Sequence, residues 1–204
     1  MRKMMAGLPF VFAVLVLMVG CAKPPQDSIN AAMSALDAAK PAASEYAASS
    51  LQAAEDAKAA LDAELKAQQD KFALFRSYKK SDELVADLKA KSDKAAADAA
   101  AGKEQAKNDA TTAINDATTA VTDAKAQLEK APKGKGTQAD LEAMKADLTA
   151  AESTIADANS AMAGEKYKDA KAKAEAAKSS AANVVSQIQA AIEAKKAGKS
   201  GKKK

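Results

Sequence analysis

Apolar side chains recur every three or four residues along most of the chain, which is the spacing of one face of an α-helix. The clearest example is a run of three related heptads, DATTAIN, DATTAVT and DAKAQLE, over residues 109–129. One seam of that run consists of Ala110, Ile114, Ala117, Val121, Ala124 and Leu128. No segment alternates with the period of a strand. The pattern predicts an all-α protein, an elongated antiparallel bundle of four or five helices with coiled-coil-like hairpins.

Two further seams predict a helical hairpin over residues 138–197. The first seam comprises Leu141, Met144, Leu148, Ala151, Ile155, Ala158 and Met162, and the second comprises Tyr167, Ala170, Ala174, Ala177, Ala181, Val184, Ile188 and Ala191. A loop over 131–137, rich in proline and glycine, precedes the hairpin, and Gly164 separates its two helices. Two amphipathic helices joined by a few residues favour antiparallel packing.

Residues 27–130 predict an N-terminal helical region that contains a long helix. Pro41 is expected to end a short first helix, because its ring clashes with the preceding turn and it has no N–H to donate. Ser44 is expected to cap the next helix, which would extend over 44–101 with a bend near residue 80. The pattern leaves open whether that long helix is continuous.

The composition agrees with a helical protein and narrows its chemistry. Alanine, the residue with the highest helix propensity, supplies about a quarter of the chain, and aromatic residues supply 3%. The chain has no His and a single Cys, so it lacks the commonest general base and the commonest transition-metal ligand. Carboxylates such as Glu55 and Asp56 are adjacent in sequence and do not face each other on a helix. We predict a protein that is not an enzyme and uses no metal or cofactor.

The N-terminus has the layout of an export signal. A positively charged start, MRK, is followed by an apolar run over residues 8–19. That run is shorter than the roughly 20 residues of a membrane-spanning helix, so it predicts a cleaved signal peptide over 1–20.

The end of this signal, Met18-Val19-Gly20-Cys21, resembles the lipobox of bacterial lipoproteins. The resemblance implies cleavage after Gly20 and a lipid on Cys21, with palmitate among its acyl chains. Residues 21–26 would then be the linker between the membrane anchor and the helices. Ala22, in place of Asp, implies the outer membrane by the sorting rule of enterobacterial lipoproteins. An ordinary secretory signal with an unmodified cysteine is the alternative.

Two short segments carry a second resemblance. The sequence ASEYA over 43–47 and the sequence GEKY over 164–167 are each followed by spaced alanines. They resemble helical-hairpin modules of uncharacterised alanine-rich lipoproteins of Gram-negative bacteria and, distantly, tetratricopeptide hairpins. The resemblance implies an envelope location and helical hairpins, and it implies no reaction.

The sequence FALFRSY over 72–78 is an aromatic cluster in the helical region. On a helix, Phe72 and Phe75 would share one face, and Leu74 and Tyr78 nearly the opposite one. A segment that is apolar on two sides is normally wedged between helices, so we expect it in the core. The alternative is a binding site for an unknown protein, formed by Phe72, Phe75 and Tyr78 with Arg76 at its polar rim. Low burial of the two phenylalanines would favour this alternative.

The lysine-rich segment 198–204 is predicted to be a disordered basic tail. It could serve solubility alone, or it could bind anionic phospholipid or wall polymer. A third interpretation is covalent attachment. Braun-type lipoproteins are similar in plan, with a lipidated cysteine, helical heptads and a C-terminal lysine joined to peptidoglycan, and the similarity implies Lys204 as the wall attachment residue. Nucleic-acid binding is not expected, because the basic residues are not interleaved with aromatics.

The sequence thus predicts a protein of the cell envelope, held on the outer membrane by its N-terminal lipid and facing the periplasm. Its expected function is structural: to scaffold or space envelope components, with tethering of membrane to wall as the sharpest form. The alternatives are a periplasmic module that docks a partner protein through its helical surface, and a holdase chaperone. The amount of exposed apolar surface distinguishes these functions.

Overall fold

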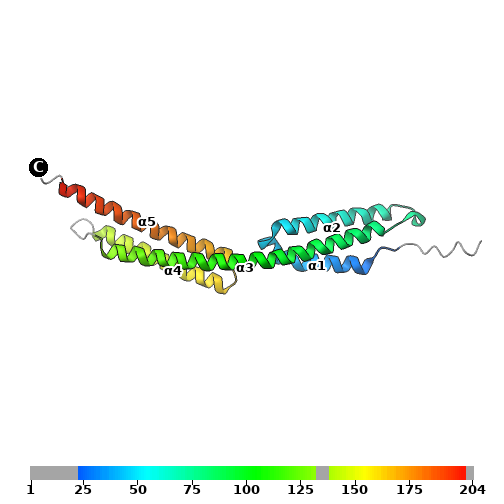
Figure 1. Cartoon of the computed structure of the whole chain (residues 1–204), viewed down its shortest axis with the longest axis horizontal. Coiled ribbons are helices and arrows are strands. Elements are labelled where there is room, and N and C mark those ends of the chain that lie inside the picture. The colour runs from blue at the N-terminus through cyan, green and yellow to red at the C-terminus, as the bar shows by residue number, and fades with distance from the viewer. Residues whose placement is uncertain (1–22, 132–137, 201–204) are drawn as a thin grey trace, which may run out of the picture. The chain divides into compact units, whose positions relative to one another are not determined.

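The computed structural model describes residues 23–131 and 138–200. The helices in these ranges are α1 (Gln26–Tyr46), α2 (Ala48–Gln69), α3 (Lys79–Glu129), α4 (Gln138–Ala163) and α5 (Tyr167–Ser200), with one 3₁₀ turn, η1, over Ala73–Phe75 (Figure 1). The described residues contain no strand. The predicted all-α helical bundle is therefore confirmed.

The helices form two compact units, which divide between Ala100 and Ala101. Unit 1 contains α1, α2 and the first part of α3, and unit 2 contains the rest of α3 with α4 and α5. The sequence suggested a division at the loop over 131–137, whereas the structure places it inside a helix. The reason is that α3 supplies both cores, with Leu88 in the first and Val121 in the second.

Unit 1 has three helices with antiparallel neighbours. Only Ala47 separates α1 from α2, and its backbone (φ −145°, ψ 47°) reverses the chain. Ion pairs join Lys40 to Glu55 across α1 and α2, and Lys80 to Glu64 across α2 and α3. The main core comprises Ile29, Ala32, Leu36, Ala54, Ala57, Leu61, Val85 and Leu88. Because each helix reverses the one before it, α1 begins at the end of the unit where α2 ends and α3 begins (Figure 1).

Two expectations for the N-terminal region are wrong. Pro41 does not end the first helix, because α1 continues to Tyr46. Pro41 is exposed, so solvent can satisfy the carbonyl oxygen that loses its N–H partner. Ser44 consequently lies inside α1 and does not cap the next helix. Its Oγ donates a hydrogen bond to the Pro41 carbonyl oxygen at 3.0 Å.

The long helix lies elsewhere than predicted. A helix over 44–101 is not continuous, because it is interrupted at Ala47 and again by the residues between α2 and α3. The helix of 51 residues is α3. Near residue 80 the chain therefore reverses its direction between two antiparallel helices, where a bend was expected.

Unit 2 contains the expected hairpin, in which α4 and α5 pack against each other. Most positions of the three predicted seams are buried in its core, among them Val121 of α3, Leu148 of α4 and Ala174 of α5. After α4 ends at Ala163, Gly164 and Glu165 form the hairpin turn. Glu165 has a left-handed backbone (φ 58°), and the N–H groups of Glu165 and Lys166 donate to Met162 and Ala161. This is the Schellman pattern that closes many helices, with glutamate at the position where glycine is usual.

α3 and α5 run parallel in unit 2, and ion pairs from α3 to α5 and to the turn before it keep one register. Lys103 pairs with Glu165, Asp109 with Lys171, and Asp116 with Lys178, at 2.6, 3.0 and 2.8 Å between nitrogen and oxygen. In every pair the partners are 62 residues apart. A constant difference in residue number over several turns requires parallel helices. Between antiparallel helices this difference would change from one pair to the next. The α4 helix therefore returns the chain between them.

These ion pairs give unit 2 a pH-dependent stability. The Lys171 ammonium holds the pKa of the Asp109 carboxyl below its usual 3.8, and the Lys103 ammonium holds the pKa of Glu165 below 4.5. The folded form thus binds these protons more weakly than the unfolded form, and the stabilisation present above the unfolded pKa values is lost as pH falls through the folded ones. We expect the urea midpoint of unfolding to fall on acidification below about pH 4.5.

The variant D109N should unfold at lower urea than the wild type at neutral pH and should show a smaller drop on acidification. D147N is a suitable control, because Asp147 is an exposed residue of α4 and belongs to none of the three ion pairs described above. Equal acid dependence in D109N and the wild type would show that the pairing does not contribute to stability.

Candidate functional site

The turn between α2 and α3 exposes three large apolar side chains. Phe72, Leu74 and Phe75 retain 69%, 66% and 75% of their full accessible surface, and we refer to them as the apolar tip. The two phenylalanine rings lie 6.3 Å apart between centroids and are tilted by 51°. They shield each other only partly, so most of the apolar surface of the tip is in contact with solvent. Isolated exposed apolar residues are ordinary, but a contiguous group is typical of a binding surface.

Side-chain hydrogen bonds hold the turn in shape. The Arg76 guanidinium donates to the carbonyl oxygens of Lys71 and Gln69, at 3.0 and 2.9 Å, which satisfies acceptors left free at the end of α2. The buried Gln68 accepts a hydrogen bond from the Ser77 backbone at 3.0 Å. These contacts fix both ends of the turn, and the apolar tip projects between them.

The interpretation of the aromatic cluster as a core segment is wrong for Phe72 and Phe75, which are exposed. The low burial of both phenylalanines favours the binding interpretation, but only some of the residues predicted for the binding site are exposed. Tyr78 is buried, with 7% of its surface exposed, and is not part of the tip. Arg76 is partly buried, and its guanidinium donates hydrogen bonds to backbone carbonyl oxygens. Leu74 belongs to the exposed group and was not among the candidate residues.

Basic residues flank the tip in the sequence. Residues 70–80 contain four basic side chains and one acidic side chain, Asp70. Of the basic residues, Lys71 and Lys79 are exposed, and Lys80 forms an ion pair with Glu64 at 3.1 Å. The amide of Gln68 and the Lys80 ammonium hold the pKa of Glu64 below its usual range, so Glu64 stays ionised and keeps its partner at neutral pH. The segment therefore carries a net positive charge beside an apolar surface.

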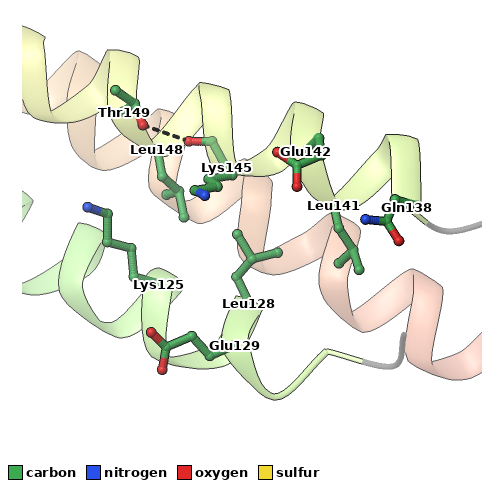
Figure 2. Close-up of a pocket in the computed structure, with 9 residues that line it drawn as sticks. All are labelled: Lys125, Leu128, Glu129, Gln138, Leu141, Glu142, Lys145, Leu148 and Thr149. Atoms are coloured by element: carbon green, nitrogen blue, oxygen red, sulfur yellow. Dashed lines mark hydrogen bonds between the residues drawn. The ribbon is translucent and has the colours of Figure 1, made fainter. Parts of the chain in front are cut away.

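Unit 2 has a groove of about 470 Å³ between α3 and α4 (Figure 2). Leu128 of α3 and Leu141 and Leu148 of α4 point toward one another and form its floor (Figure 2). Lysine and glutamate side chains form its rim. One of them, Lys125, forms an ion pair with Glu152, at 2.6 Å between nitrogen and oxygen. The floor is part of the packed core of unit 2.

The described residues contain no group of three or more histidine, cysteine, aspartate or glutamate side chains arranged to hold a metal ion. Within the same residues, no helix combines the length and the apolar character that crossing a membrane requires. The candidate residues Gly20, Cys21 and Lys204 lie outside the described residues. No protein-family model, curated protein or solved structure matches the chain.

Proposed function

We propose that this chain is a lipid-anchored protein of the bacterial cell envelope with a structural, non-enzymatic role. Cys21 carries the lipid, the anchor lies in the outer membrane, and the helical units extend into the periplasm. The observation that supports this most strongly is the apolar signal that ends at Gly20, directly before Cys21, with α1 beginning at Gln26, the fifth residue after Cys21. A linker this short leads directly from the modified residue to a folded unit.

The architecture supports a scaffolding role. Both cores consist of alanine and aliphatic seams, which let the helices lie close together over many turns. The described carboxylates with a shifted pKa are held ionised by neighbours: Asp98, for example, pairs with Lys94 on the same helix and accepts a hydrogen bond from Ser50 of α2. Such a body can space or position other envelope components.

Fractionation of a Gram-negative host that expresses the full chain tests the anchor. The wild type is expected in the membrane fraction and to resist extraction by high salt, which removes proteins held by charge alone. C21S should lose signal-peptidase II processing and keep its uncleaved signal, so the mature-length band should disappear. C21S processed to the same length as the wild type would contradict the proposal.

A tether between membrane and wall is the most specific version of this function, and it requires a covalent link between Lys204 and peptidoglycan. Boiled cell-wall sacculi digested with muramidase should release a peptide in which Lys204 carries a muropeptide remnant. An unmodified Lys204 would remove the tether and leave the lipid anchor untouched. The two parts of the proposal are therefore tested separately.

A periplasmic protein-binding module is the second candidate function, and one observation favours it. Phe72, Leu74 and Phe75 are exposed together on one turn, which is a common arrangement for a surface that docks a partner.

A further inference from the structure

The position of the apolar tip within unit 1 limits which surfaces it can contact. The tip lies in the turn from α2 to α3, and α1 begins at this same end, because Ile29 of α1 packs in one core with Leu61 of α2 and Val85 of α3 (Figure 1). The opposite end is formed by the turn at Ala47. The chain enters unit 1 beside the tip.

The distance from Cys21 to this end is short. Gln26 is the fifth residue after Cys21, and five steps of about 3.3 Å give a reach of roughly 17 Å when the chain is fully extended. Pro24 and Pro25 lie within this stretch, and proline restricts the backbone toward extended conformations. A lipid on Cys21 would therefore keep the end that carries the tip near the membrane surface, and the Ala47 end away from it.

The chemistry of the tip matches the interface of a phospholipid membrane. Aromatic and leucine side chains bury themselves at the boundary between headgroups and acyl chains, and nearby lysines are attracted to anionic headgroups. Here Phe72, Leu74 and Phe75 supply the apolar part, and Lys71 and Lys79 supply exposed positive charge beside it. The hydrogen bonds of Arg76 to the backbone fix the turn, so little ordering is needed before insertion.

We propose that the apolar tip inserts into the interface of the same phospholipid membrane that holds the Cys21 lipid. This inference rests on the proposed lipid anchor, and it adds a second point of contact at the same end of unit 1. Two contacts restrict the tilt of the unit relative to the membrane, whereas the lipid alone would leave it free to swing on its linker. A partner protein is less favoured as the occupant, because the tip lies at the end that the anchor keeps close to lipid.

A tryptophan reporter tests the insertion directly, because the chain has no Trp of its own. The variant F75W places the reporter in the tip, and S49W places it at an exposed position near the opposite end of unit 1. Each variant, purified in its lipid-bearing form, is reconstituted into vesicles of brominated phosphatidylcholine and phosphatidylglycerol. We expect strong quenching and a blue shift for F75W and little of either for S49W.

A second variant separates insertion from the effect of the reporter itself. Adding F72S and L74S to F75W removes the other two apolar side chains, and the fraction of reporter in contact with brominated lipid should fall by about tenfold. Circular dichroism should be unchanged, since all three residues are exposed. Unquenched F75W would overturn the proposal, and so would equal quenching of F75W and S49W, which would mean that the unit lies flat on the membrane.

Two separate measurements distinguish a protein that carries no lipid on Cys21 from one whose apolar tip does not insert. The mass of the N-terminal peptide reports whether Cys21 carries lipid, whereas quenching reports only what surrounds residue 75. If F75W is unquenched in vesicles but becomes blue-shifted when a periplasmic protein fraction is added, the tip docks a protein and the membrane proposal is wrong.

Discussion

Replacing Leu61 with alanine is expected to destabilise unit 1 by about 2–5 kcal/mol, the largest effect that we predict for a single residue. Leu61 is fully buried, with 0% of its surface exposed, and it packs with Leu36 and Leu88 from the neighbouring helices. Much of the core is alanine, so few other large side chains are available to close the cavity. The loss would be visible as a lower urea midpoint in circular dichroism.

The matched control is L74A, which removes the same atoms from a residue that is 66% exposed. Its stability should lie within about 0.5 kcal/mol of the wild type, because an exposed side chain leaves no cavity. Hydrogen exchange localises the effect: amides of α2 should exchange faster in L61A, and amides of α5 should change less. An L61A protein as stable as L74A would contradict the packing of unit 1.

Replacing Ala177 with leucine is expected to cost unit 2 about 1–3 kcal/mol, through overpacking. Ala177 retains 1% of its surface and lies in the core formed by α3, α4 and α5. Alanine at such a position lets the helices approach closely, and three extra carbon atoms have no space unless the helices move apart. Thermal unfolding should show the loss as a decrease of several degrees in the melting temperature.

The exposed neighbour Ala176 provides the control, since A176L adds the same atoms one residue earlier on the same helix. Leucine and alanine have similar helix propensities, so A176L should unfold within a few tenths of a kcal/mol of the wild type. If A177L matched A176L, the alanine seam would not set the distance between the helices of unit 2.

The fold of unit 2 could be predicted from the sequence because its signals are local and regular. The heptads over 109–129 place Ala117 and Val121 on one face, and both are buried as expected. Gly164 marks the hairpin turn, although the left-handed residue is Glu165, one position later. The parallel register of α3 and α5 was not predicted, because it depends on which helices become neighbours and not on the pattern along either one.

The errors in unit 1 come from turns that lack the usual breakers. The segment from Asp70 to Tyr78 contains neither glycine nor proline, so the apolar pattern suggested a helix running through it. The chain turns there because side-chain groups of Gln68 and Arg76 satisfy the backbone, which a pattern of apolar positions does not reveal. Conversely, Pro41 suggested a break where exposure of the residue lets the helix continue.

The same error concealed the composition of the candidate site. Once residues 70–78 form a turn in place of a helix, Leu74 joins Phe72 and Phe75 on the exposed side while Tyr78 enters the core. Sequence alone identified the unusual cluster of aromatic residues and the condition, low burial, that would give it a binding role. It could not place that cluster beside the start of α1, which depends on the order in which the three helices reverse.

The proposed function depends on Cys21 as the membrane anchor, and the N-terminal peptide of the mature protein tests this role most directly. The full chain should be expressed in a Gram-negative host, purified from its membranes, digested with protease and examined by mass spectrometry. We predict a peptide that begins at Cys21 and carries the added mass of a diacylglyceryl group on its sulfur. A mature protein that begins at another residue, or that begins at Cys21 without lipid, would contradict the account.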